Sequence, residues 1–194
     1  GEIMGSVGIT EPFAGEDLSG IQTSLTDLGD CYRLNGSKIF ISNAGLSDYY
    51  AVMARLGPQK GLEGLTMVGV EKGMRGFAVG KLEGKMGLRA HPTGELVFED
   101  CLVPKKHLLG GEGGGMGVFM GVIGPALLGC GASSLGIARA AFEKAVSYAK
   151  ERYTFGQPLG KHQAVQMMVF DMATAMEASR LLLYRAAHDF DCGR

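Results

Sequence analysis

The sequence predicts an α+β protein: a β-barrel or sandwich domain of antiparallel strands, followed by a long antiparallel helical hairpin. Two observations predict this division. Of the 32 glycines, 24 lie in residues 1–117, where short strands need frequent turns, and only three lie beyond Gly136. After the glycine-rich segment 110–117, the apolar residues recur every third or fourth position, as they do on one face of a helix.

The first hundred residues alternate between polar and apolar over short stretches. Ile21–Asp27 alternates, Gly29-Asp30 predicts a turn, and Cys31–Leu34 alternates again. Asn35-Gly36 predicts a two-residue hairpin turn before Lys38–Ile41. Further strands are predicted at Tyr50–Leu56, Leu65–Glu71, Phe77–Lys81 and Glu95–Val103, and Pro104 ends the β domain because it has no N–H to donate.

Residues 118–194 predict two helices joined by a turn at Thr154–Gly160. The first helix carries one apolar face, formed by Leu135, Ala138, Phe142, Ala145, Val146 and Ala149. The second carries an apolar stripe, formed by Val165, Met168, Val169, Met172 and Met176, which is typical of plain core. We therefore expect a β domain over residues 1–109, a linker over 110–117 and a helical part over 118–194.

Charge and cysteine content exclude several classes of protein. The 19 basic and 20 acidic residues form no basic cluster, so no nucleic-acid partner is expected. The four cysteines are scattered, which favours reduced, mostly buried thiols, no metal site and a cytoplasmic protein, or one of the mitochondrial matrix in a eukaryote. Gly113–Ala138 lacks charge and is long enough to cross a membrane, but its nine glycines and Pro125 favour a packed helix, so no membrane partner is expected.

Four motifs, in order along the chain, resemble those of the acyl-CoA dehydrogenase family. Gly8–Gly20 resembles T-E-P-x-A-G-x-D, and Tyr32–Asn43 resembles Y-x-[IL]-N-G-x-K-x-[WF]-I-[TS]-N. Gly87–Pro104 resembles G-x-R…F-x-D-x-x-V-P, and Ala149–Gln163 is similar to the family's A-x-x-R-x-x-F-G turn between helices. The resemblance implies the middle β-barrel domain and the first two helices of a four-helix C-terminal domain. The family's N-terminal helical domain and last two helices would lie outside this chain.

The resemblance also implies a flavoenzyme of fatty acid metabolism. Family members use FAD to convert an acyl thioester such as acyl-CoA into the 2-enoyl thioester, and they pass electrons to an electron-transferring flavoprotein. They assemble as homo-oligomers, either dimers or tetramers. Electron transfer to oxygen, as in an acyl-CoA oxidase, and desaturation of a carrier-protein-linked acyl group are alternatives. An alternative from another class is a non-catalytic β-barrel module that serves assembly only.

The resemblance assigns FAD contacts to nine residues. Thr10 matches a position at the pyrimidine edge of the flavin, and Phe40, Ile41 and Ser42 match residues along the isoalloxazine ring, with the Ser42 hydroxyl near N5. An ordinary strand position for Thr10 and a place in the barrel core for Phe40 are the competing interpretations. Arg152 and Thr154 match positions that reach the FAD of a neighbouring subunit, and Phe155, His162 and Gln163 match further contacts to it. Without the motif, Arg152 would be interpreted as a partner of the helix dipole.

The chain departs from the family's pattern at four positions. Glu16 replaces a small hydroxyl residue and His91 replaces a small polar one, so both are candidate substrate contacts. Gly124 and Leu127 stand where many members have the Asp and Arg that contact CoA, which puts that contact in doubt and makes a carrier-protein-linked acyl group a more credible alternative. No carboxylate lies between Gly113 and Ala138, so we expect no catalytic residue in this chain, a catalytic Glu beyond Arg194, and no activity from residues 1–194 alone.

Overall fold

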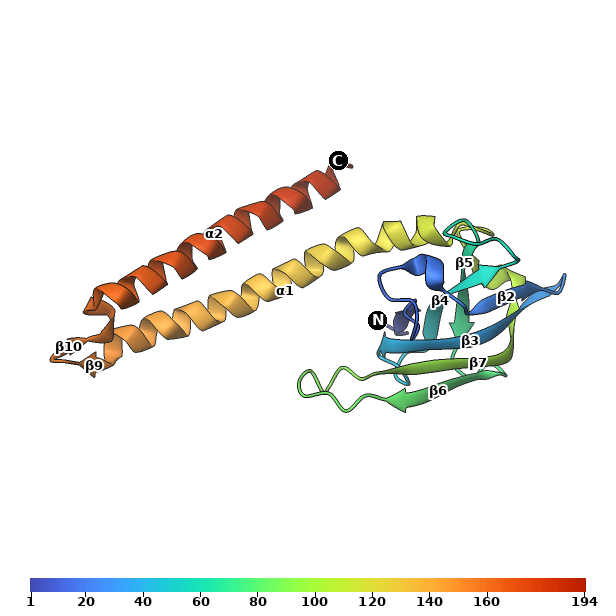
Figure 1. The fold of residues 1–194 in the computed structure, drawn as a ribbon, viewed down its shortest axis with the longest axis horizontal. Coiled ribbons are helices and arrows are strands. Elements are labelled where there is room, and N and C mark those ends of the chain that lie inside the picture. The colour runs from blue at the N-terminus through green and yellow to red at the C-terminus, as the bar shows by residue number, and fades with distance from the viewer. The chain divides into compact units, whose positions relative to one another are not determined.

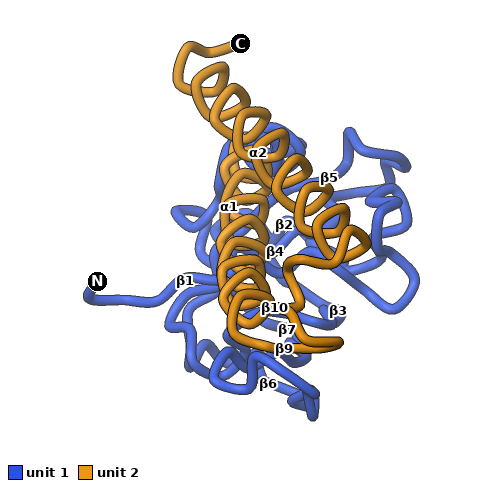
Figure 2. The backbone as a smooth tube through the Cα atoms, turned by 90° about the vertical axis from the view of Figure 1, so that its left-hand side faces the viewer, with its two compact units in different colours: residues 1–120 blue, residues 121–194 orange.

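The computed structural model describes all 194 residues, which form two compact units, residues 1–120 and 121–194 (Figure 2). The first unit is a β domain and the second is a pair of long helices, so the predicted fold class is confirmed. Helix α1 (Gly115–Glu151) begins inside the segment predicted as a linker. The remaining loop, Gly110–Gly114, contains three glycines with positive φ, a backbone conformation that glycine adopts without strain.

The β domain contains one eight-stranded sheet (Figure 1). Its strands are β1 (Gly5–Gly8), β2 (Ser24–Asp27), β3 (Cys31–Ser42), β4 (Tyr49–Leu56), β5 (Leu65–Glu71), β6 (Phe77–Leu82), β7 (Thr93–Pro104) and β8 (Leu108–Leu109). They lie in the order β6-β7-β3-β2-β4-β5-β8, and β1 pairs with β4. The sheet is not closed into a barrel, because β6 and β8 are free edges, but it is compatible with a sandwich.

The expectation that all strands are antiparallel is wrong for two strand pairs. Both β1 and β2 run parallel to β4. The segment 9–23, which includes the short 3-10 helix Leu18–Gly20, carries the chain back after β1, so that β2 runs in the same direction. The sheet is therefore mixed.

The hairpin turn predicted at Asn35-Gly36 is also wrong. The chain reverses earlier, at Leu28–Asp30, where the Leu28 amide bonds to the carbonyl of Cys31 and Gly29 has a φ of 93°. Strand β3 continues through Asn35-Gly36, and the Asn35 side chain bonds across to Asp100 of β7, accepting from its amide at 2.7 Å. Tertiary pairing thus satisfies a side chain whose type predicts a turn.

The central strands are buried on both faces. Val52 and Ala54 of β4 belong to the larger core cluster, whereas Met53 belongs to a second cluster on the other face. The first turn of α1 packs on that second cluster through Met116, Val118 and Phe119. Six consecutive residues of β5, Leu65–Val70, are buried, as expected for a strand covered on both sides.

The second unit is an antiparallel helical hairpin (Figure 1). Helix α1 is followed by the two short strands β9 (Tyr153–Thr154) and β10 (Gln157–Pro158). A 3-10 turn (Leu159–Lys161) and helix α2 (Gln163–Asp191) come next. Glycines on α1 allow large side chains of α2 to approach it. A β-carbon on Gly131 would lie 3.2 Å from Leu183 Cδ1, and one on Gly124 would lie 3.5 Å from a ring carbon of Phe190.

Of the apolar residues predicted to form the core of the two helices, only Ala149 of α1 is buried within this chain. Helix α2 has no buried residue, and Met168 of its predicted core stripe is 63% exposed. Helix α1 is long and apolar enough to cross a membrane by length and composition alone, and its most apolar window is not buried. All four cysteines are free, as expected, but only Cys101 is buried.

Candidate functional site

A bulge in β3 determines where Phe40 points. Lys38 pairs with Leu96 and Ile41 pairs with Gly94, so Ile39 and Phe40 together lie opposite the single residue Glu95. Phe40 has a φ of 58°, a left-handed conformation that is rare for an aromatic residue, and its side chain is 61% exposed. The bulge therefore turns the ring out of the domain, which excludes the interpretation of Phe40 as core.

The segment after β1 is hydrogen-bonded to this bulge. The Ile39 amide donates to the carbonyl oxygen of Thr10 at 2.9 Å, and the Lys38 ammonium donates to the carbonyl oxygen of Ile9 at 3.0 Å. Thr10 is half-buried. Two motifs that are about thirty residues apart in the sequence are thus adjacent in the β domain.

Ile41 and Ser42 differ in the way they could meet a ligand. The Ile41 side chain is only 3% exposed and belongs to the core, so Ile41 can contact a ligand through its main chain only. Ser42 is exposed, and its carbonyl oxygen accepts a hydrogen bond from the Ser6 hydroxyl. Phe40 and Ser42 are thus the exposed side chains of this part of β3.

The two candidate substrate contacts are exposed, in different loops. His91 lies in the loop between β6 and β7, which is tied to the end of β3 because the Asn43 amide donates to the carbonyl oxygen of Pro92 at 2.7 Å. Glu16 lies in the turn before the first 3-10 helix, where its carbonyl oxygen accepts from the Leu18 amide. Only His91 is therefore connected to the Phe40 end of β3 by the backbone hydrogen bonds described.

A second group of candidate residues gathers at the turn between α1 and α2. The Nε2 atom of His162 lies 3.1 Å from the Thr154 hydroxyl and 3.2 Å from the Thr154 carbonyl oxygen. A carbonyl oxygen only accepts, so Nε2 is the donor in the contact with Thr154, and Nδ1 lies 3.4 Å from the side-chain amide nitrogen of Gln157. These contacts fix the orientation of the imidazole ring.

Phe155 forms the tip of this turn. Phe155 and Gly156 both have positive φ, 52° and 78°, as the central residues of a tight type I′ hairpin do. The Phe155 side chain is 98% exposed and its ring lies edge-on to His162, with the centroids 6.2 Å apart. Arg152 and Gln163, on either side of the turn, are exposed. A strained and fully exposed aromatic residue is typical of a binding position.

The sequence motifs contained Glu11 and Lys38, but no role was predicted for either. Both are buried, and their side chains form an ion pair with 2.7 Å between Nζ and Oε1. Burial lowers the pKa of Lys38 to about 8, although Glu11 acts to raise it. Burial alone would raise the pKa of Glu11, but hydrogen bonds from Lys38, Thr23 and the Gln22 amide lower it. The alternation of side chains along β3 could have indicated this burial, because Lys38 lies an even number of residues after the inward-facing Tyr32 and Leu34.

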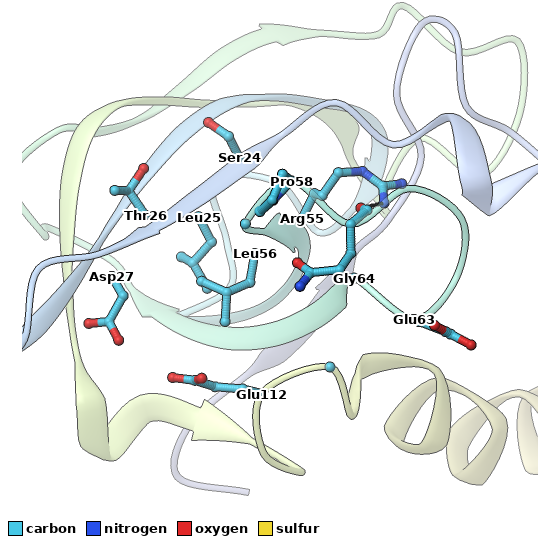
Figure 3. Close-up of a pocket in the computed structure, with 13 residues that line it drawn as sticks. Ser24, Leu25, Thr26, Asp27, Arg55, Leu56, Pro58, Glu63, Gly64 and Glu112 are labelled. Carbon is cyan, nitrogen blue, oxygen red and sulfur yellow. Dashed lines mark hydrogen bonds between the residues drawn. The ribbon is translucent and has the colours of Figure 1, made fainter.

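The β domain also contains a cleft of about 770 Å³ beside β2 (Figure 3). Asp27 and Glu112 lie on one side of it, and Lys105 forms ion pairs with both, at 2.7 and 3.5 Å. Arg55 lies on the other side, and its guanidinium donates to four main-chain carbonyl oxygens. These charged groups are already paired with protein atoms, and no predicted site residue lines the cleft.

Two family profiles match nearly the whole chain. The profile described as "Acyl-CoA dehydrogenase, middle domain" matches residues 6–101, and "Acyl-CoA dehydrogenase, C-terminal domain" matches residues 113–194. The first match contains Thr10 and the Phe40 bulge, and the second contains the Phe155 turn. Each profile thus covers one of the two groups of candidate residues.

Individual relatives agree with these profiles. The short-chain specific acyl-CoA dehydrogenase of Clostridium acetobutylicum is 44% identical over 188 residues, covering 97% of this chain and 50% of that protein. The structure of butyryl-CoA dehydrogenase from Megasphaera elsdenii matches with a TM-score of 0.94 and 44% identity, covering 99% of this chain and 50% of that one. A structure of PigA with FAD and proline matches with a TM-score of 0.96 and 34% identity over all of this chain and 50% of that one. The chain thus spans about half the length of the relatives it matches.

Proposed function

This chain belongs to the acyl-CoA dehydrogenase family, and we propose that the protein containing it desaturates an acyl thioester with FAD as its cofactor. The reaction removes a proton from the α-carbon and a hydride from the β-carbon, and it yields the 2-enoyl thioester. FAD, when bound, accepts the hydride. The observation that carries the proposal is the pairing of the Thr10 segment with the bulge that exposes Phe40.

The residues of the β domain fit a flavin ring. Phe40 offers an exposed aromatic face, and aromatic rings stack on one another in offset arrangements. The Ser42 hydroxyl is exposed on the same strand and is available to donate to a ring nitrogen that gains electron density. Thr10 adds a hydroxyl and a main-chain position beside the bulge. Helix α1 holds no carboxylate between Gly115 and Ala138, so this stretch offers no proton acceptor for the α-carbon.

Reconstitution of the full-length protein tests this proposal. We expect the purified protein to bind FAD, and acyl-CoA esters to bleach the flavin absorbance. The Ser42→Ala variant should slow this reduction, whereas Ser24→Ala, which removes an exposed hydroxyl from β2, should not. A full-length protein that carries no flavin absorbance after FAD has been added and the unbound FAD removed would instead support a non-catalytic assembly module.

A second candidate substrate class follows from α1. Gly124 and Leu127 provide no charge at the positions where the family resemblance places CoA contacts, so an acyl group on a carrier protein is the alternative to acyl-CoA. Parallel assays with the same acyl group on CoA and on a carrier protein distinguish the two. The electron acceptor is tested in the same preparation: reduction of an electron-transferring flavoprotein supports a dehydrogenase, and oxygen consumption supports an oxidase.

We also propose that the flavin is shared between two copies of the protein in a homo-oligomer. The group around Phe155 is exposed and includes the Arg152 guanidinium, which suits a phosphate. Co-expression of Phe40→Ala with Phe155→Ala tests the sharing. If each flavin contacts two copies, mixed dimers regain one intact site, and part of the FAD binding returns. If each flavin contacts one copy only, mixing restores nothing.

A further inference from the structure

The β domain contains only one ion pair in which both side chains are buried, Lys38 with Glu11. It lies beside Thr10, one of the residues proposed to meet the flavin. Lys38 and Glu11 are 0% and 6% exposed at their side chains, and their charged atoms are 2.7 Å apart. All other ion pairs of this domain include at least one side chain that is more than a quarter exposed. Taking two charges out of water is costly, and an apolar pair of similar volume often stabilises a fold equally well. Stability alone is therefore a weak reason for this pair.

The Glu11 carboxylate connects three segments of the chain. Its Oε1 atom accepts from the Lys38 ammonium and from the Thr23 amide at 3.0 Å, and its Oε2 atom accepts from the Gln22 amide at 2.7 Å. Glu11 thus links the segment after β1, the segment before β2, and β3. Such fully hydrogen-bonded buried networks fix one arrangement of the backbone.

The Lys38 ammonium completes the connection from the other side. It donates to Glu11 and also to the carbonyl oxygen of Ile9, so it holds the residues on both sides of Thr10. Ile39, the next residue along β3, bonds to Thr10 itself. Phe40, the strained residue of the bulge, follows directly. Lys38 and Ile39, the two residues that precede Phe40, therefore fix Thr10 relative to Phe40.

We propose that Lys38 and Glu11 are positioning residues that hold Thr10 and Phe40 in the relative placement that a flavin ring requires. This inference rests on the proposed function, because it presumes that Thr10 and Phe40 face the flavin. Neither charged group touches the ring. Their effect is to prevent the Thr10 segment from shifting along β3, a shift that would separate the two contacts.

A double variant separates positioning from folding. Lys38→Met combined with Glu11→Gln removes both charges together and keeps the side-chain volumes, and its one acceptor oxygen can serve either the Thr23 amide or the Gln22 amide. Lys105→Met combined with Asp27→Asn is the matched control, since this partly exposed pair has the same 2.7 Å separation and lies away from Thr10 and Phe40. Each is made in the full-length protein and compared by FAD dissociation constant, absorbance spectrum of the bound flavin, and denaturation midpoint.

We expect the Lys38/Glu11 double variant to keep a denaturation midpoint close to that of the wild type but to bind FAD about tenfold more weakly, with a shifted spectrum of the bound flavin. The control double variant should change neither the affinity for FAD nor the spectrum of the bound flavin. Wild-type affinity and an unchanged spectrum in the double variant would overturn the inference. So would a loss of affinity that only follows the unfolded fraction.

Two further results also have a defined meaning: a double variant that does not fold, and a wild type that binds no FAD. If the double variant does not fold, Glu11→Asp takes its place, since it keeps both charges and shortens only the reach of the carboxylate: weaker FAD binding by folded protein supports positioning, and unchanged binding refutes it. If the wild type itself binds no FAD, the proposed function fails, and this inference fails with it. Failure of the inference alone is recognised by a wild type that binds FAD and variants that bind it equally well.

Discussion

Gly36 lies directly against Thr23 in the β domain: a β-carbon at Gly36 would stand 2.7 Å from the Thr23 hydroxyl oxygen and 2.8 Å from its α-carbon. Gly36 also has a φ of 137°, a conformation that other residues rarely adopt. The glycine that suggests a hairpin turn in the sequence is therefore required for a close approach of the backbone within the sheet.

This approach predicts a strong effect of Gly36→Ala. We expect the substitution to lower the free energy of unfolding by about 3 kcal/mol, because backbone strain and a steric clash act together. Gly29→Ala is the matched control: Gly29 also has positive φ but has open space around its α-carbon, so strain alone should cost about 1 kcal/mol. Urea denaturation measures both, and equal effects would contradict the contact with Thr23.

The exposed position of Phe40 at the bulge predicts that its side chain contributes to FAD binding and not to stability. Phe40→Gly relieves a left-handed φ and removes a mostly exposed ring, so the free energy of unfolding should stay within about 1 kcal/mol of the wild type. Phe40→Ala keeps the strain and should be the less stable of the two variants. Both should weaken FAD binding about tenfold in a flavin titration. Two variants that bind FAD like the wild type would show that the ring does not meet the flavin.

The exposed Phe155 in the turn between the helices is likewise expected to contribute to FAD binding and not to stability. Phe155→Asn places a residue that tolerates positive φ at the tip, so the thermal midpoint should not fall. FAD should dissociate faster, since a fully exposed aromatic side chain is lost. Tyr153→Asn, which removes an exposed aromatic residue from the adjoining strand, is the control and should leave FAD dissociation unchanged. Equal dissociation rates for all three proteins would count against a role for Phe155.

The lowered pKa of Glu11 predicts an acid-dependent loss of stability. Its contribution is present above the unfolded value of 4.5 and is lost as the pH falls through the lower pKa of the folded state. At pH 6 we expect Glu11→Gln to be less stable than the wild type by about 2 kcal/mol, and the difference should shrink below pH 4.5. Asp17 and Asp27, whose pKa values are also lowered, are present in both proteins and cancel. A difference that stays constant from pH 6 to pH 3 would contradict the shift.

Most elements of the fold could be predicted from the sequence. Apolar segments between glycine-bearing turns identified β4 and β5 almost to the residue, and the change of apolar spacing identified the two helices. The turn at Gly29 was also correct, because its signal is local: the Asp27 carboxylate accepts from the Gly29 amide at 2.8 Å. Predictions held where the determining interactions lie within a few residues of one another.

The arrangement of the candidate site could be predicted only in part. The motifs identified Thr10, Phe40 and the Phe155 turn, but they did not show that Phe40 points outward while Ile41 is buried. That difference depends on the bulge opposite Glu95, which arises from pairing between β3 and β7. Pairing between strands so far apart in the chain leaves no local pattern.

By itself, the sequence determined the family, the β domain followed by a helical hairpin, and the set of candidate residues, because these depend on local periodicity and motif order. Only the tertiary structure decided that Asn35-Gly36 continues a strand, that the sheet is mixed, and that Lys38 and Glu11 form a buried pair beside Thr10. The physical reason is that the deciding partners are far apart in the sequence. The fully buried Lys38 must find a partner within the fold and pairs with Glu11, and the half-buried Asn35 bonds to Asp100 on the neighbouring strand.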